Sequence, residues 1–267
     1  MALTLVTVDV NGLRDANKRA GLLHKLSHLS ASFVCLQETH ISSCSDGEHW
    51  FSSFGFQVVS SPGSVRSWTV VLYRPIFHLL NVWNDTEGRF VLCEFSYRDQ
   101  NFRVCSVYAP NHNPDRDDFF EFVCNSVDPS VPTILSGDFN AVFDCSVHRR
   151  GSCPSSVSCD SSNTLSSLFC NCCVLDIWRV LHPLQLGFTW DKPDGSLSSR
   201  FDLFGCPYSW ASSVSSCEIL PCPLSDHSTL LFCASLFLFS LLRKETWVRK
   251  LDFRYKKWSR GCCLKHW

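Results

Sequence analysis

Apolar residues in this chain occur mostly in short runs separated by polar turns, a pattern typical of β-strands. Strand-like runs occupy residues 3–10, 33–40, 54–60, 67–73, 90–97, 102–107, 131–135, 214–219 and 229–233. Helical spacing of apolar residues occurs at 15–30, 115–127 and 164–173, and residues 145–163 are predicted to form a surface loop. Strands and helices alternate with short connections, which favours one α/β domain over residues 1–235 with two packed sheets flanked by helices.

Polar side chains stand where these strands end. In the segment 134–140, Ile-Leu-Ser-Gly-Asp-Phe-Asn, an apolar run leads into Asp138 and Asn140. Positions two apart in an extended segment point the same way, so both side chains could face one site. Taken alone, the segment could equally be a turn, because Gly, Asp and Asn are turn residues.

The same arrangement recurs at other predicted strand ends, and its repetition favours a site over unrelated loop residues. The further polar residues at these ends are Asp9, Asn11, Glu38, Tyr108, Asp202, Asp226 and His227. Carboxylates and amides are ligands suited to Mg²⁺ or Mn²⁺, with Glu38 as the main candidate. A base that activates water and an imidazolium that Asp202 keeps protonated would favour phosphoester hydrolysis.

Charge is distributed unevenly along the chain, although the net charge is only −1. Residues 243–267 hold nine Lys or Arg and two Asp or Glu, a balance of +7, which leaves −8 on residues 1–242. An acidic body suits cation binding, whereas the tail, residues 236–267, suits either a polyanion or a solvated end. Its basic residues and Trp247, Trp258 and Trp267 could bind nucleic acid through charge and stacking.

The chain contains seventeen cysteines, which raises the question whether it works in an oxidising or a reducing compartment. The first residues lack the charged and apolar regions of an export signal, so we expect an intracellular, reduced chain, located in the nucleus if it acts on DNA. Cys170, Cys172 and Cys173 lack a second pair or a histidine at zinc spacing, so zinc is not expected. The apolar run 230–242 is too short to cross a bilayer, and we expect no membrane association.

Six motifs follow one another in the order found in a known superfamily. They are V-D-V-N-G-L-R (8–14), L-Q-E-T-H (36–40), V-Y-A-P-N (107–111), S-G-D-F-N (136–140), S-S-R-F-D (198–202) and L-S-D-H (224–227). Over residues 3–235 the chain thereby resembles the endonuclease/exonuclease/phosphatase superfamily. Its D-I-W-R, F-T-W and C-P-L-S-D-H segments most resemble the apurinic-type endonuclease domain of LINE-type (non-LTR) retrotransposons. The resemblance implies a four-layer α/β sandwich with two mixed β-sheets flanked by helices.

The resemblance also implies roles for matching residues. Glu38 would bind Mg²⁺ or Mn²⁺ with Asp9, Asn11 and Asp226 near the metal. Asp138 would activate or position water that Asn140 orients, Tyr108 would contact the scissile phosphate, and Asp202 would pair with His227. The implied reaction is nicking of one DNA strand by a monomer, leaving a 3′-hydroxyl that primes reverse transcription. Candidates for DNA contact are Arg14, Asn111, Trp190 and Arg200, and Trp190 could equally be a core residue.

The chain departs from the family pattern in ways that leave alternatives open. Asp9 stands where the family usually has Asn, Phe201 replaces an aliphatic residue as a packing change, and no reverse transcriptase domain is present in this sequence. One alternative is an abasic-site repair nuclease, or a phosphoinositide or sphingomyelin phosphatase, on the same fold. Another is a catalytically inactive retroelement remnant.

Overall fold

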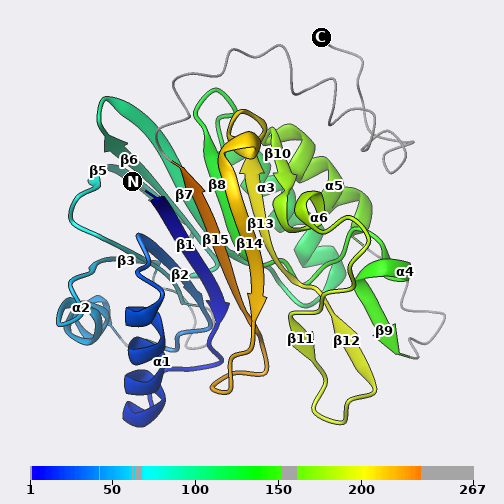
Figure 1. The fold of residues 1–267 in the computed structure, drawn as a ribbon, viewed down its shortest axis with the longest axis horizontal. Coiled ribbons are helices and arrows are strands. Elements are labelled where there is room, and N and C mark those ends of the chain that lie inside the picture. The colour runs from blue at the N-terminus through cyan, green and yellow to red at the C-terminus, as the bar shows by residue number, and fades with distance from the viewer. Residues whose placement is uncertain (1, 42, 62, 64–67, 152–160, 236–267) are drawn as a thin grey trace.

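Two six-stranded mixed β-sheets pack face to face in the computed structural model, which describes residues 2–41, 43–61, 63, 68–151 and 161–235 (Figure 1). The first sheet has the order β14-β15-β1-β2-β4-β3, in which only β1 and β2 are parallel. Its strands are β1 (Ala2–Asp9), β2 (Phe33–Gln37), β3 (Gln57–Ser61), β4 (Thr69–Tyr73), β14 (Val214–Leu220) and β15 (Thr229–Ser235).

The second sheet has the order β10-β13-β8-β7-β6-β5, in which only β7 and β8 are parallel. Its strands are β5 (His78–Asn84), β6 (Phe90–Tyr97), β7 (Gln100–Tyr108), β8 (Thr133–Asp138), β10 (Val174–Asp176) and β13 (Asp202–Pro207). A small third sheet joins β9 (Arg149–Gly151), β12 (Leu197–Ser199) and β11 (Trp190–Asp191), and β11 and β12 form a hairpin.

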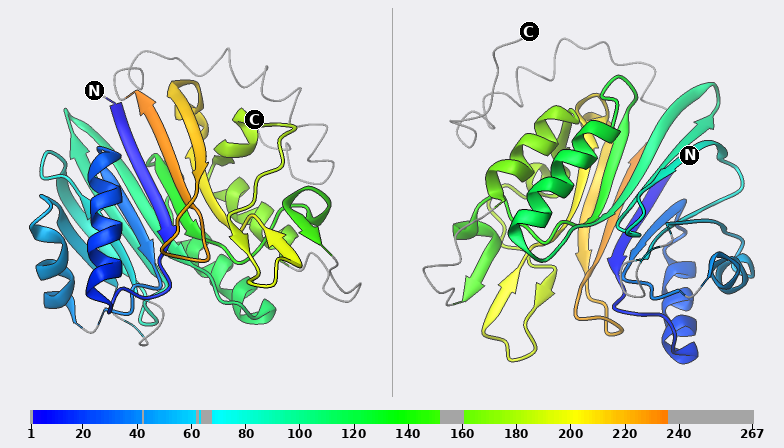
Figure 2. Two further views of the ribbon diagram at one scale, coloured as in Figure 1. Left: turned by 60° about the horizontal axis from the view of Figure 1, so that its bottom comes forward. Right: turned by 180° about the vertical axis from the view of Figure 1, so that it is seen from behind.

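Helices cover the outer face of each sheet, so the layers run helix, sheet, sheet, helix (Figure 2). The first sheet is covered by α1 (Ala16–His28) and α2 (Cys44–Ser52), and the second by α3 (Asn113–Ser126) and α5 (Ser162–Asn171). Shorter helical segments are α4 (Cys145–His148), α6 (Ile177–Leu181) and the 3₁₀ helix η1 (Tyr208–Ser213). This confirms the expected four-layer α/β sandwich.

Alternation along β1 shows why the first sheet needs cover on both faces. Leu3 and Leu5 join the apolar core between the two sheets, whereas Val6 and Val8 pack with Leu22 and other residues of α1. Successive side chains of a strand point to opposite faces, so a strand that is apolar at nearly every position is buried on both sides. Helix α1 begins where the Asp15 carboxylate accepts a hydrogen bond from Lys18 N at 2.7 Å, an N-cap.

Several elements differ from the sequence-based expectation. The predicted loop over 145–163 contains α4 and β9, and α5 begins at Ser162, while residues 152–160 lie outside the described part of the chain. The edge strand β5 escaped prediction because nearly all its residues are exposed and a bulge between Leu79 and Asn81 breaks its alternation. The predicted tail, 236–267, also lies outside the described residues. Within those residues, no helix has the length and apolarity needed to traverse a membrane.

Candidate active site

Strand register brings the polar strand ends to one edge of the sandwich. In the first sheet, Asp9 at the end of β1 pairs with Gln37 at the end of parallel β2, and Glu38 follows directly. The carboxyl ends of parallel neighbours share an edge, so Asp9 and Glu38 are brought together from residues far apart in sequence. His227 reaches the same edge because it lies two residues before β15, which runs antiparallel to β1.

The second sheet repeats this arrangement. Tyr108 ends β7 and pairs with Asp138 at the end of parallel β8. The antiparallel strand β13 begins at Asp202, directly opposite Asp138. The two sheets therefore present their polar ends on the same side of the molecule, where the β11–β12 hairpin also projects (Figure 1).

Three of the residues that follow these strands adopt a left-handed backbone conformation, with positive φ. Asn11, Glu38 and Asn140, which follow β1, β2 and β8, have φ of 44°, 49° and 48°. Asn tolerates this conformation through local hydrogen bonding, whereas for Glu38 it costs about 1–3 kcal/mol, a strain that clusters at functional sites. Gly137 has φ of 132°, and a Cβ there would lie 2.0 Å from the Val107 carbonyl oxygen, so glycine is required before Asp138.

The strand ends surround a cleft of about 360 Å³. Its lining consists of Asp9, Asn11, Glu38, Tyr108, Asn111, Asp138, Asn140, Trp190, Leu197, Phe201, Asp226 and His227. Four of these residues are carboxylic acids, and the lining formed by the described residues includes no Lys or Arg. Such a cleft repels a phosphodiester unless a cation offsets its charge.

Asp202 and His227 form a buried acid–histidine pair. Asp202 Oδ2 lies 2.8 Å from His227 Nδ1, and both side chains are buried. Burial opposes a charged imidazole, but the charge and hydrogen bond of Asp202, aided by Asp138 and Asp9, raise the pKa of His227 well above its ordinary value. The buried pair therefore favours the protonated, imidazolium form of His227.

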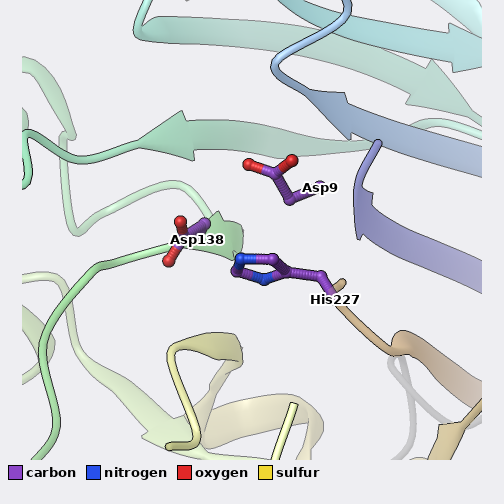
Figure 3. Close-up of side chains that lie close together, drawn as sticks. All are labelled: Asp9, Asp138 and His227. Carbon is purple, nitrogen blue, oxygen red and sulfur yellow. The ribbon is translucent and has the colours of Figure 1, made fainter. Parts of the chain in front are cut away.

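The side chains of Asp9, Asp138 and His227 lie close together where strands of the two sheets end (Figure 3). One potential ligand atom from each lies within 4.8 Å of the other two. Burial raises the pKa of Asp138 to about 7, and burial raises the pKa of Asp9 well above its ordinary value, although the positive charge of His227 opposes both shifts. Buried oxygen ligands with too little positive charge around them fit a hard divalent cation such as Mg²⁺ or Mn²⁺.

Glu38 and Tyr108, which also line the cleft, are in direct contact. The Tyr108 hydroxyl donates a hydrogen bond to Glu38 Oε1, and Glu38 Oε2 lies 3.8 Å from His40 Nε2. Burial, followed by the hydrogen bond to Glu38, raises the pKa of Tyr108 above its ordinary value. Tyr108 is thus a neutral hydroxyl donor beside the carboxylates and not an anionic group.

Asn11 and Asn140 each form a short turn with the preceding carboxylate. Asn140 N donates to Asp138 Oδ1 at 2.8 Å, and Asn140 Nδ2 donates to Ala109 O at 2.9 Å. Asn11 N donates to Asp9 Oδ1 at 2.9 Å. Asp138 and Asn140 share the cleft as expected, but the expected geometry was wrong. The extended strand ends at Asp138, and a left-handed turn instead of a continued strand brings Asn140 into the cleft.

The four candidates for DNA contact have different surroundings. Asn111 and Trp190 line the cleft, whereas Arg14 is exposed outside it and donates to the His40 carbonyl at 3.1 Å. Trp190 is half-buried and its indole packs 5.7 Å from the Phe201 ring, so it is a cleft residue instead of a core residue.

Arg200 corrects the sequence-based expectation of DNA contact. Its exposed fraction is 0%, and its guanidinium forms an ion pair with Asp176 at 2.5 Å. The same guanidinium lies 2.9 Å from His148 Nε2. An arginine with no exposed surface cannot reach DNA, and its role is to hold α6 and the start of β13 together.

Three residues that position the site were not predicted to do so. Thr189 Oγ1 accepts hydrogen bonds from the backbone N–H groups of Phe201 and Asp202, each at 3.0 Å. Ser225 Oγ donates to the Asp9 carbonyl at 2.7 Å and accepts from His227 N at 3.1 Å. Thr189 and Ser225 stand inside recognisable motifs, but a hydroxyl alone carries no distinctive signal. Phe201, expected only to change packing, lines the cleft.

Comparison with known proteins places this geometry in context. The model of the Endonuclease/Exonuclease/phosphatase family matches residues 6–227. The Transposon TX1 uncharacterized 149 kDa protein of Xenopus laevis is 26% identical, with 97% of this chain and 21% of that protein covered. An exodeoxyribonuclease of Bacillus subtilis is 28% identical over 52% of this chain and 58% of its own length. The chain thus spans about a fifth of the first relative and less than two thirds of the second.

Solved structures share the fold. An AP endonuclease from Leishmania major superposes with a TM-score of 0.72 at 16% identity, covering 87% of both chains. An AP endonuclease from Archaeoglobus fulgidus gives 0.72 at 18% identity, covering 88% of this chain and 100% of that one. A 3′ phosphatase from Neisseria bound to a product DNA hairpin gives 0.67 at 17% identity, covering 86% and 98%. At these identities the likeness concerns the fold.

Proposed function

Because the chain belongs to the endonuclease/exonuclease/phosphatase family, we propose that it is a divalent-metal-dependent endonuclease that nicks one strand of duplex DNA. The observation that carries the proposal is the acid–histidine pair Asp202–His227, which faces Asp9 and Asp138 in a cleft that needs a cation to accept a phosphodiester. Retroelement origin is supported by the similarity to the TX1 transposon protein along nearly the whole chain.

In this proposal, Asp9, Asn11, Glu38 and Asp226 would hold Mg²⁺ or Mn²⁺. The bound ion would offset the charge of the phosphate and of the cleft carboxylates. Its fit rests on the oxygen donors of the cleft and on the buried carboxylates, whose charges no Lys or Arg of the described lining balances.

Four side chains of the cleft would have separate roles in hydrolysis. Asp138 would orient the attacking water and take its proton, and Asn140 would help to align that water. As the water oxygen bonds to phosphorus, the P–O3′ bond would break, and the leaving 3′-oxygen would take a proton from solvent. His227, held as an imidazolium by Asp202, would donate to a non-bridging phosphate oxygen as negative charge develops there. Once substrate enters, the Tyr108 hydroxyl would donate a hydrogen bond to the scissile phosphate in place of the one it now donates to Glu38.

Alternative substrates on the same fold are separated by a substrate panel. We would compare an intact A/T-rich duplex, the same duplex with one abasic site, a 3′-phosphorylated duplex and a phosphoinositide headgroup, each with Mg²⁺. Cleavage of the intact duplex, with ends that a polymerase can extend, supports nicking that leaves a 3′-hydroxyl. Exclusive cleavage of the abasic duplex would identify a repair nuclease. Exclusive hydrolysis of the headgroup would identify a lipid phosphatase.

An inactive retroelement remnant is the alternative of a different class. Its motivation is Asp9, a carboxylate where the family usually has an amide. Turnover on the intact duplex that is lost in Asp138→Ala and in His227→Ala would exclude it. No turnover on any of the four substrates by folded protein would support it and would leave only the family fold.

A further inference from the structure

Asp226 is held from two sides, by groups that come from different elements. Its Oδ1 accepts a hydrogen bond from Asn11 Nδ2 at 3.2 Å, and its Oδ2 accepts one from Trp190 Nε1 at 3.1 Å. The Ser225 hydroxyl adds a longer contact to Oδ1 at 3.4 Å. Asp226 is exposed, so these contacts and not burial restrict its rotamer.

Trp190 is attached to the segment that carries Asp226 by its backbone as well. It begins β11 and forms an antiparallel bridge with His227, while Ser228 N donates to Thr189 O at 2.6 Å. The β11–β12 hairpin and residues 225–228 are therefore joined side by side. A shift of the Trp190 indole would therefore also shift the Asp226 carboxylate to which it donates a hydrogen bond.

The indole itself is held in place by its neighbour. Its ring packs against that of Phe201 with centroids 5.7 Å apart and planes inclined by 37°. The packed indole thus favours one fixed orientation of the Asp226 carboxylate.

We propose that Trp190 is a positioning residue whose indole N–H fixes the Asp226 carboxylate beside Asn11 and so raises the affinity of the cleft for a divalent cation. This inference rests on the proposed function in that it takes Asp226 to be a ligand of the metal. An exposed aspartate loses rotamer freedom when it binds a cation, and a fixed one has already lost it. Hydrogen-bonding partners of metal ligands typically contribute about 10–100-fold in metal affinity.

The variant that tests the proposal is Trp190→Phe, which keeps an aromatic ring against Phe201 and removes the N–H donor. The matched control is Trp50→Phe on α2. Trp50 is half-buried, as Trp190 is, but its ring packs against Arg19 and does not line the cleft. Asp226→Ala, alone and combined with Trp190→Phe, completes a double-mutant cycle that isolates the coupling between the two side chains.

The readout is Mg²⁺ affinity measured by isothermal titration calorimetry on the full chain without DNA. Thermal unfolding of each metal-free variant confirms that it is folded. We expect Trp190→Phe to weaken Mg²⁺ binding about tenfold, Trp50→Phe to leave it unchanged, and Trp190→Phe to cause no further loss once Asp226 is alanine. Mg²⁺ affinity equal to that of the wild type in Trp190→Phe, or an equal loss with and without Asp226, would overturn the proposal. Calorimetry needs no turnover, so a wild-type chain that fails to nick DNA would overturn the proposed function and leave this test intact.

Discussion

Asp202 begins a strand of the second sheet and His227 lies just before a strand of the first, yet Oδ2 of Asp202 lies 2.8 Å from Nδ1 of His227. Asp202 begins β13 of the second sheet, and His227 lies in the segment that leads into β15 of the first. The pair therefore depends on the packing of the two sheets as well as on the local sequence. It also fixes the charge of the only imidazole that lines the cleft in the described part of the chain.

Removing the charge of Asp202 should lower the pKa of His227 while leaving the imidazole in place. In Asp202→Asn the largest of the attractions that oppose burial is lost, so the pKa of His227 should fall. We expect nicking to fall about 10²–10³-fold, the loss seen when a group that stabilises developing charge is removed. NMR titration of the imidazole checks the pKa. An unchanged His227 pKa in Asp202→Asn would contradict this explanation.

Asp138 should make the metal-free protein less stable as the pH rises. Burial raises the pKa of the folded carboxyl to about 7, above about 3.9 in an unfolded chain. The stabilisation from this proton is complete below the unfolded pKa and is lost as the pH rises through the folded pKa. His227 acts in the same direction, because its folded pKa also lies above its unfolded value.

We therefore expect a lower Tm at about pH 8 than at about pH 5 for metal-free protein, and a smaller difference in Asp138→Asn. Mg²⁺ should raise the Tm more at the higher pH, because its ligands must be deprotonated. Differential scanning calorimetry with EDTA and with Mg²⁺ measures both effects. The same Tm difference in the wild type and in Asp138→Asn would contradict the raised pKa of Asp138.

The variant Asp9→Asn restores the amide that the family usually has at this position and so tests what the carboxylate does. Asp9→Asn removes one of the clustered carboxylates, so we expect weaker Mg²⁺ binding and a more stable metal-free protein above neutral pH. Calorimetric titration and thermal unfolding measure these two effects on the same samples. Tighter Mg²⁺ binding or a gain of nicking in Asp9→Asn would show that the carboxylate impairs the site.

Replacing Arg200 by alanine should lower the free energy of unfolding far more than replacing Arg14. Arg200→Ala leaves Asp176 buried without its partner and should cost about 3–5 kcal/mol of unfolding free energy. Arg14 is exposed, so Arg14→Ala should alter stability by no more than about 0.5 kcal/mol. Urea denaturation separates the two variants. Comparable stability losses would contradict the assignment of a structural role to Arg200 alone.

The fold was largely predictable because β1, β2, β7 and β8 read as strands and their polar ends stand out. The residues at those ends, including Glu38 and Tyr108, do share one cleft. Their grouping follows from strand order and register, which link residues far apart in the chain, and no local pattern contains that information. The family resemblance supplied it in advance.

Other parts of the site required the structure. Arg200 looks like a surface residue in sequence, and only the folded chain shows that Asp176 neutralises it in the interior. The left-handed turn at Asn140 is also hidden, because the Asp-x-Asn spacing suits an extended segment and a turn equally well. The hydrogen bond from Trp190 to Asp226 joins residues 36 positions apart, and no local pattern predicts it.

Nicking of supercoiled plasmid DNA in Mg²⁺ by the wild-type chain, Asp138→Ala and His227→Ala is the decisive test of the proposed endonuclease. We expect the wild type to convert supercoiled plasmid to open circles, EDTA to stop the reaction, and both variants to lose it while remaining folded. Undiminished nicking by either folded variant, or no nicking by folded wild-type protein, would contradict the proposed function.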